Sequence, residues 1–201
     1  MTSQADALAC IALGVHAIGV NFWPATPRYC DPRTAHAIAE AVGSQATVVG
    51  VFVDETAEHV RELMKQTGIR WVQLHGKESP SYVRDFLPHA YKALAVTDAV
   101  IIDVARRYPG EHVLLDTYVR GMPGGTGQTF HWDLAKPVAQ ERKLTLAGGL
   151  NPHNVAEAVR EVKPYRVDVA SGVEASPGKK DLDLVRAFVQ AVQSADAYES
   201  R

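Results

Sequence analysis

The hydrophobic positions of this chain fall into short runs with little polar alternation, and a helical pattern follows each run. The runs predict seven strands: 16–22, 47–53, 70–75, 91–96, 112–117, 143–148 and 166–171. Helices are predicted to begin near Pro32, Glu55, Ser79, Thr97, His131, Pro152 and Asp181, and one more helix over 5–13 precedes the first strand. Strands that are apolar on both faces and separated by helices are typical of a buried parallel sheet.

The position of the glycine-rich turns distinguishes between two possible α/β folds. A doubly wound open sheet usually has such a turn directly after its first strand, whereas here the turns follow the sixth and seventh strands. That order favours a (β/α)8 TIM barrel, which needs about 200 residues at its shortest. No linker rich in Pro, Gly or Ser divides the series, so residues 1–201 are expected to form a single barrel domain. The count is then one strand short, and the first β-strand is expected to precede Met1.

Composition and charge exclude several classes of protein. The chain is 46% hydrophobic and 22% charged, with a net charge of -2 and no block of Lys and Arg, so a nucleic-acid partner is not expected. No apolar run approaches the roughly 20 residues that span a bilayer, and the first residues do not resemble a secretory signal. Cys10 and Cys30 are the only cysteines, which is too few for a disulfide framework and unlike any metal-binding spacing. A cytoplasmic setting without membrane contact is expected.

Two glycine-containing loops follow consecutive strands, at the end of a barrel where phosphate commonly binds. "LAGGLNPHNV" turns on Gly148 and Gly149, and Asn151 is predicted to cap the helix that follows. "DVASGVEASPG" repeats the arrangement with Ser171 and Gly172. Glycine lets the backbone approach a ligand, and exposed N–H groups at a helix start attract an anion. One such turn alone would be an ordinary tight turn, but two in consecutive units favour a phosphate site.

Three other polar residues lie at or after strand ends, where barrel active sites are found. Asp116 ends the strand of "LLDT" and is either a cap for the next segment or a proton-transfer group. Arg28 of "TPRY" has the shape to bind a carboxylate, although loop arginines are more often solvated. His75 of "WVQLH" is either a proton shuttle or a structural histidine. The stretch "GMPGGTGQT", over 121–129, lacks the spacing and lysine of a nucleotide-binding loop and is interpreted as a lid.

In order along the chain, eight stretches resemble phosphoribosylanthranilate isomerase, a barrel enzyme of tryptophan biosynthesis. They are "ADALACIALGVHAIGVNF", "TPRY", "GVFV", "VQLHG", "LLDT", "GGTGQTFHW", "LAGGLNPHNV" and "VDVASGVEASPGKKD". The resemblance implies an intramolecular oxidoreductase that performs an Amadori rearrangement of N-(5-phosphoribosyl)anthranilate to 1-(2-carboxyphenylamino)-1-deoxyribulose 5-phosphate. No cofactor or metal is expected, because substrate positioning and two proton transfers account for this chemistry.

The resemblance also implies roles for the residues already singled out. Asp116 corresponds to the family's general acid, which protonates the ring oxygen, and Arg28 to the arginine that faces the anthranilate carboxylate. The phosphate is expected on the two glycine loops, and His75 is grouped with the substrate-binding residues while its role stays open. The expected substrate-binding set is Arg28, His75, Gly148, Gly149, Ser171 and Gly172.

The general base is the point at which this chain departs from the family. The family carries a Cys at the end of its first strand, in a run like "KICGIT", and alignment places Met1 just after the Cys-Gly pair. A start assigned to an internal Met is the favoured explanation, because a seven-stranded remnant leaves two strand edges unpaired. If the chain truly begins at Met1, the alternative function is a non-catalytic phosphosugar-binding barrel. Two sister barrels, a histidine-pathway sugar isomerase and indole-glycerol-phosphate synthase, are further alternatives, and monomer and homodimer both remain open.

Overall fold

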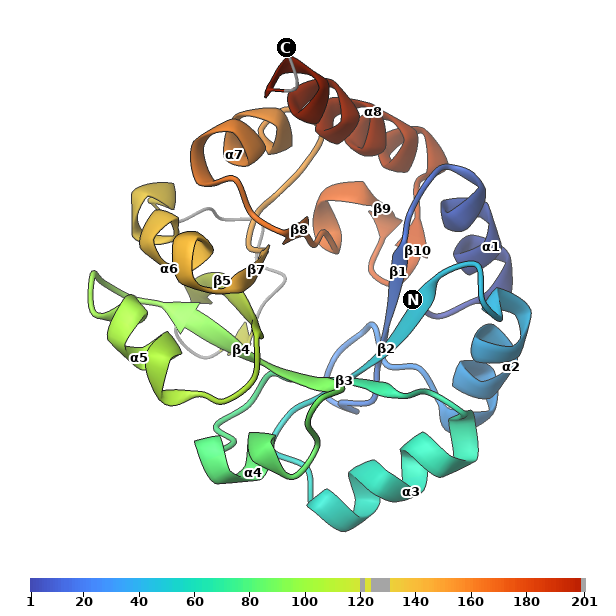
Figure 1. The fold of residues 1–201 in the computed structure, drawn as a ribbon. Coiled ribbons are helices and arrows are strands. Elements are labelled where there is room, and N and C mark those ends of the chain that lie inside the picture. The colour runs from blue at the N-terminus through green and yellow to red at the C-terminus, as the bar shows by residue number, and fades with distance from the viewer. Residues whose placement is uncertain (120–121, 124–130, 200–201) are drawn as a thin grey trace.

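Seven parallel strands of the chain curve into a ring that helices surround on the outside (Figure 1). The computed structural model describes residues 1–119, 122–123 and 131–199. Neighbouring strands follow the order β1 (Ala17–Asn21), β2 (Thr47–Phe52), β3 (Trp71–Leu74), β4 (Ala90–Val96), β5 (His112–Val119), β7 (Lys143–Leu146) and β8 (Arg166–Val167). All of these pairings are parallel. The seven predicted strands are confirmed, and within the described residues no strand lies between β8 and β1.

Two short antiparallel pairs accompany the parallel strands. β6 (Met122–Pro123) pairs with the end of β5, and β9 (Glu174–Ser176) pairs with β10 (Lys179–Lys180) as a separate two-stranded sheet. Near that small sheet, the Thr2 hydroxyl donates to the carbonyl of Gly178 at 2.5 Å, which holds the first residues beside it.

Helices connect the strands as the sequence predicts. They are α1 (Gln4–Ala12), α2 (Pro32–Val42), α3 (Ala57–Thr67), α4 (Pro80–Arg84), α5 (Ile101–Arg107), α6 (Lys136–Glu141), α7 (Val155–Val162) and α8 (Leu182–Glu199), with single 3-10 turns η1 (Trp132–Leu134) and η2 (Ser171–Val173). Side chains of Ser3, Asp31, Thr56 and Ser79 accept backbone N–H bonds at four helix starts, which satisfies donors that helices leave unpaired. None of the described helices is both long and apolar enough to cross a membrane.

Three helices begin later than predicted: α5 at Ile101 rather than near Thr97, α6 at Lys136 rather than near His131, and α7 at Val155 rather than near Pro152. Asn151 was expected to cap the helix after β7, but α7 begins at Val155 with Asn154 at its cap position. The cause is local, because the Asn151 side-chain oxygen accepts the N–H of His153 at 2.9 Å and closes a tight turn over 152–154. The glycine loop after β7 is therefore longer than the sequence pattern indicates.

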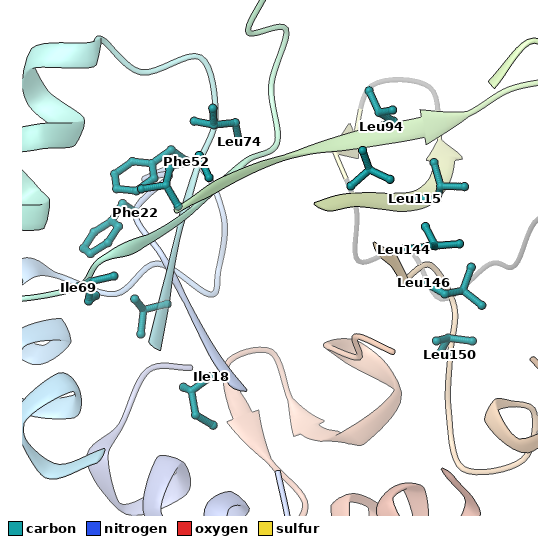
Figure 2. Close-up of a cluster of buried hydrophobic side chains, with 14 of the residues drawn as sticks. Ile18, Phe22, Phe52, Ile69, Leu74, Leu94, Leu115, Leu144, Leu146 and Leu150 are labelled. Atoms are coloured by element: carbon teal, nitrogen blue, oxygen red, sulfur yellow. The ribbon is translucent and has the colours of Figure 1, made fainter. Parts of the chain in front are cut away.

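Apolar side chains on the strands alternate between two clusters. On β5, Val113 and Leu115 belong to the large cluster between the strands and the helices, whereas Leu114 belongs to a small cluster with Ala93 and Ala147. Figure 2 shows members of the large cluster spread around the curved sheet. Each buried Leu or Phe of this kind contributes about 1.5–3 kcal/mol to folding.

The inside of the ring is more polar than its outer face. Two of its described residues, Gln73 and Thr145, are buried polar side chains on β3 and β7, on the faces opposite Leu74 and Leu146. Tyr91 packs against the small apolar cluster. A barrel whose interior carries amides and hydroxyls can connect side chains at its rim through hydrogen bonds rather than through packing alone.

A buried ion pair ties together the loops that follow β2 and β3. Lys92 of β4 lies 3.3 Å from Glu78, and the two side chains are 3% and 2% exposed. The Lys92 ammonium also donates to the carbonyls of Leu74, Gly76 and Ala93 at 2.6–3.0 Å. Glu78 accepts the backbone N–H groups of Asp54 and Gly76. Burial lowers the pKa of Lys92, and the Glu78 carboxylate opposes that shift. We call this buried ion pair of Lys92 and Glu78 the clamp, because it holds the loops after β2 and β3 together.

Candidate active site

The residues selected from the sequence lie at the carboxyl ends of the strands, which share one rim of the ring. Arg28 lies in the loop after β1, His75 directly follows β3, and Asp116 lies near the end of β5. The two glycine loops follow β7 and β8. Because parallel strands bring these ends to the same side, residues far apart in sequence lie at one end of the ring.

Asp116 and His75 are in direct contact at this rim. The Nε2 atom of His75 lies 3.3 Å from Oδ2 of Asp116, and their side chains are 18% and 9% exposed. Strand β4 lies between β3 and β5, and its residue in register with Asp116 is Ala95. A small side chain there leaves room for the imidazole to reach the carboxylate. His75 is therefore part of the site, while its contact with a substrate stays a prediction.

Asp168 is a further carboxylate at the rim that the sequence analysis did not single out. It directly follows β8. The surrounding barrel displaces water from its carboxyl and thereby raises its pKa, and the Asp116 carboxylate raises that pKa further. Lys180 and His75 act in the opposite direction. The signal was present in "VDVAS", which ends a strand with an acid just as "LLDT" does.

The two glycine loops lie against each other. A Cβ atom added to Gly172 would overlap the carbonyl oxygen of Leu150, in the loop after β7, so only glycine permits this approach. Gly148 and Gly149 have φ angles of 87° and 66°, in the region that favours glycine. The Asn154 side chain donates to the carbonyl of Gly149 at 3.0 Å and fixes the loop. The predicted pair of loops thus forms one continuous surface.

Backbone N–H groups of these loops have no hydrogen-bond acceptor among the described residues. Within the described part of the chain, no hydrogen bond to a protein acceptor is found for the N–H of Gly148, Gly149, Ser171 or Gly172. Ser171 and Gly172 begin the 3-10 turn η2, where the first N–H groups have no partner within the turn. Such donors, grouped at two adjacent turns, suit an anion with several oxygen atoms.

Arg28 is only partly exposed, and Glu174 holds its guanidinium. Its Nε and Nη2 atoms donate to the Glu174 carboxylate at 3.0 and 2.8 Å, and the Lys180 ammonium lies 3.3 Å from the same carboxylate. Burial alone would raise the pKa of Glu174, but the hydrogen bond from Arg28 and the charge of Lys180 outweigh it and lower that pKa. Glu174 thus orients the guanidinium, and the predicted contact of Arg28 with a substrate carboxylate stays a prediction.

The two cysteines are buried. Cys10 is 3% exposed within α1 and Cys30 is 2% exposed. Burial raises the pKa of both thiols, and that of Cys30 to about 11. The interpretation of 121–129 as a lid falls almost entirely outside the described residues. Over the part of the chain that the structure describes, no group of three or more His, Cys, Asp or Glu side chains is arranged to hold a metal ion.

Comparison with known proteins places this site in a family. The family model of N-(5'phosphoribosyl)anthranilate (PRA) isomerase matches residues 1–191. The chain is 44% identical over 204 residues to N-(5'-phosphoribosyl)anthranilate isomerase of Myxococcus xanthus, covering 99% of this chain and 96% of that protein. It is 39% identical over 196 residues to the enzyme of Trichlorobacter lovleyi, with 97% and 96% covered.

Solved structures agree with the sequence relatives. The phosphoribosyl anthranilate isomerase of Thermotoga maritima superposes with a TM-score of 0.88 at 37% identity, covering 96% of each chain. A phosphoribosyl anthranilate isomerase in complex with reduced 1-(o-carboxyphenylamino)-1-deoxyribulose 5-phosphate has a TM-score of 0.85 at 34% identity, covering 96% of this chain and 95% of that one. On the family match, the extent of the sequence identity and the shared barrel, this chain belongs to the N-(5'-phosphoribosyl)anthranilate isomerase family.

Proposed function

We propose that this protein isomerises N-(5-phosphoribosyl)anthranilate to 1-(2-carboxyphenylamino)-1-deoxyribulose 5-phosphate in tryptophan biosynthesis. The observation that carries the proposal is the pairing of Asp116 with His75 on the same rim as two glycine loops whose N–H groups have no acceptor among the described residues. An acid and an anion site on one rim are what an acid-catalysed rearrangement of a sugar phosphate requires. Family membership and the related structure in complex with the reduced product-like phosphosugar support the same substrate.

Asp116 is the proton donor in this proposal. When the carboxylic acid protonates the ring oxygen, the bond from that oxygen to C1 breaks and the anthranilate nitrogen forms a double bond to C1. A base then removes the proton on C2, and the electron pair moves through C1 toward the nitrogen to give the enolamine. Uptake of a proton at C1 and loss of the proton from the C2 hydroxyl then yield the ketose. Positioned proton transfer of this type contributes about 10²–10⁴-fold to a rate.

The other residues hold the substrate. The phosphate binds the N–H groups of Gly148, Gly149, Ser171 and Gly172, and the anthranilate carboxylate binds Arg28, which Glu174 keeps in place. His75 contacts the acid from the β3 side of the rim. The protein acts on a small-molecule phosphosugar and needs no cofactor or metal. We further propose that the protein is cytoplasmic and that it is a monomer or a homodimer. The Thermotoga maritima relative is described as dimeric.

One observation favours a second candidate function. The family's base is a cysteine, and both cysteines of this chain are buried with raised pKa values, so neither is expected to supply a thiolate. A barrel that binds the phosphosugar without converting it is consistent with that finding. The two functions share the anion site and Arg28 and differ only in turnover.

One assay separates the two functions. Purified chain is mixed with phosphoribosylanthranilate, and loss of its fluorescence is followed. The isomerase predicts turnover that Asp116→Asn lowers by about 10²–10⁴-fold. Asp85→Asn removes an exposed carboxyl at the end of α4 and serves as the matched control. Phosphosugar binding without turnover supports the second function, and a chain that neither binds nor converts the compound refutes both.

A further inference from the structure

Four side chains inside the ring form a continuous row that ends at the acid. The Tyr91 hydroxyl donates to Oε1 of Gln73 at 3.0 Å, and Nε2 of Gln73 lies 2.8 Å from Nδ1 of His75. The other ring nitrogen of His75 lies 3.3 Å from Oδ2 of Asp116. Three adjacent strands, β3, β4 and β5, supply these residues. The proposed reaction mechanism uses the last two and gives no role to Tyr91 or Gln73.

Strand geometry explains why the row forms. Gln73 and His75 are two residues apart on β3 and its continuation, so their side chains point to the same face. Gln73 pairs in register with Tyr91 of β4. Gln73 is 6% exposed, so its amide satisfies its hydrogen bonds within the protein rather than with bulk water.

The amide orientation decides which nitrogen of His75 carries the proton. The amide nitrogen of Gln73 can only donate, so the Nδ1 atom that faces it must accept and carries no hydrogen. A neutral imidazole then carries its single proton on Nε2, the atom that faces Asp116. Burial raises the pKa of Tyr91 and the Asp168 carboxylate raises it further, so this hydroxyl keeps its proton and continues to orient the amide.

We propose that Gln73 is a positioning residue that, anchored by Tyr91, fixes the tautomer of His75 and thereby directs the acidic proton of Asp116. With the Nε2–H group of His75 facing Oδ2, the proton that Asp116 transfers to substrate is carried on Oδ1. In the opposite tautomer a lone pair of Nε2 would face Asp116 and compete with the substrate for that proton. The catalytic consequence rests on the proposed isomerase function, whereas the tautomer does not.

The substitution Gln73→Glu tests this role with little change of shape. It replaces the donating NH₂ by an oxygen that accepts, so Nδ1 of His75 gains a proton. We expect kcat to fall by about 10- to 100-fold, the range seen when an orienting hydrogen bond is lost, with a much smaller change of KM. Gln66→Glu, on the exposed face of α3, makes the same chemical change away from the rim and is expected to leave kcat and KM unchanged.

The tautomer itself is measured by NMR of protein labelled with ¹⁵N-histidine, with His75 assigned by the signals that His75→Asn removes. We expect Nδ1 unprotonated and Nε2 protonated in the wild-type chain, the reverse or a doubly protonated ring in Gln73→Glu, and a mixture of tautomers in Tyr91→Phe. Gln66→Glu should match the wild type. Circular dichroism and thermal melting establish that each variant is folded.

Two results would overturn the proposal. One is a wild-type His75 that carries its proton on Nδ1. The other is a Gln73→Glu variant whose His75 tautomer changes while kcat stays at the level of Gln66→Glu. A chain with no turnover in any form refutes the isomerase function and the catalytic role of Gln73 together, and the NMR measurement then still decides whether the amide sets the tautomer.

Discussion

The contact between the two glycine loops can be tested by adding one methyl group. In Gly172→Ala the new Cβ would lie about an ångström closer to the carbonyl oxygen of Leu150 than real Cβ atoms approach, and the obstacle is backbone, so the loops must separate. Forcing atoms into a packed contact costs about 1–3 kcal/mol of stability. At this chain length that corresponds to a fall in Tm of roughly 2–4 °C per kcal/mol.

The effect on the site should exceed the effect on stability. A displacement of about 1 Å in a residue that positions the substrate costs on the order of 10²-fold in rate. Because the displaced N–H groups are those proposed to bind the phosphate, we expect most of this loss as a higher KM, together with weaker binding of inorganic phosphate in calorimetric titration. The chain offers a matched control in Gly68→Ala, which ends α3.

The control separates a loss of stability from a loss of geometry. Gly68 has a φ angle of 76° and nothing lies within 4 Å of its added Cβ, so alanine there costs about 1–2 kcal/mol of backbone strain without moving the rim. Both variants should melt earlier, but only Gly172→Ala should bind phosphate more weakly. If Gly172→Ala melts earlier and yet retains the phosphate affinity and KM of Gly68→Ala, the reasoning about the paired loops is wrong.

Three other predictions follow from buried charges and thiols. Lys92→Met leaves the Glu78 carboxylate buried without its partner, and urea unfolding should show a loss of about 3–5 kcal/mol. Because the pKa of Glu174 is lowered in the folded state, its ionisation stabilises the fold above pH 4.5, and this stabilisation is lost as the pH falls through the pKa of the folded state. The free energy of unfolding of Glu174→Gln should therefore fall less steeply between pH 7 and pH 3. An unchanged slope would contradict the pairing with Arg28. With a pKa of about 11, roughly one Cys30 thiol in a thousand is ionised at pH 8, so alkylation measured by mass spectrometry should be slow until urea unfolds the chain.

The strands were predictable because their apolar runs are unambiguous. The helix starts were less predictable. The strand predicted over 112–117 appears as His112–Val119, whereas the one predicted over 166–171 is regular only at Arg166–Val167. In the described chain β8 pairs with β7 alone, so its later residues lack a second neighbour to keep them extended. The proline in "LNPHN" pointed to a helix start three residues too early, because the Asn151 side chain closes a turn instead.

The site residues at strand ends were predictable, but their partners were not. Asp116 and His75 stand out in sequence as polar residues after apolar runs. Glu174, which holds Arg28, lies 146 positions away from it in the sequence. In the sequence, Gln73 is simply one polar residue within a predicted strand. Contacts between distant segments depend on the register and curvature of the strands, and no local pattern carries that information.

The clamp of Lys92 and Glu78 makes the two halves of the rim unequal. On the β2–β4 side a carboxylate of the protein itself already accepts the inward N–H groups of Asp54 and Gly76. On the β7–β8 side the corresponding donors are those proposed to bind the substrate phosphate. In that proposal, the phosphate takes on one half of the rim the role that Glu78 has permanently on the other. Binding should therefore slow amide exchange around 148–150 and 171–173 and leave 76–78 as it was.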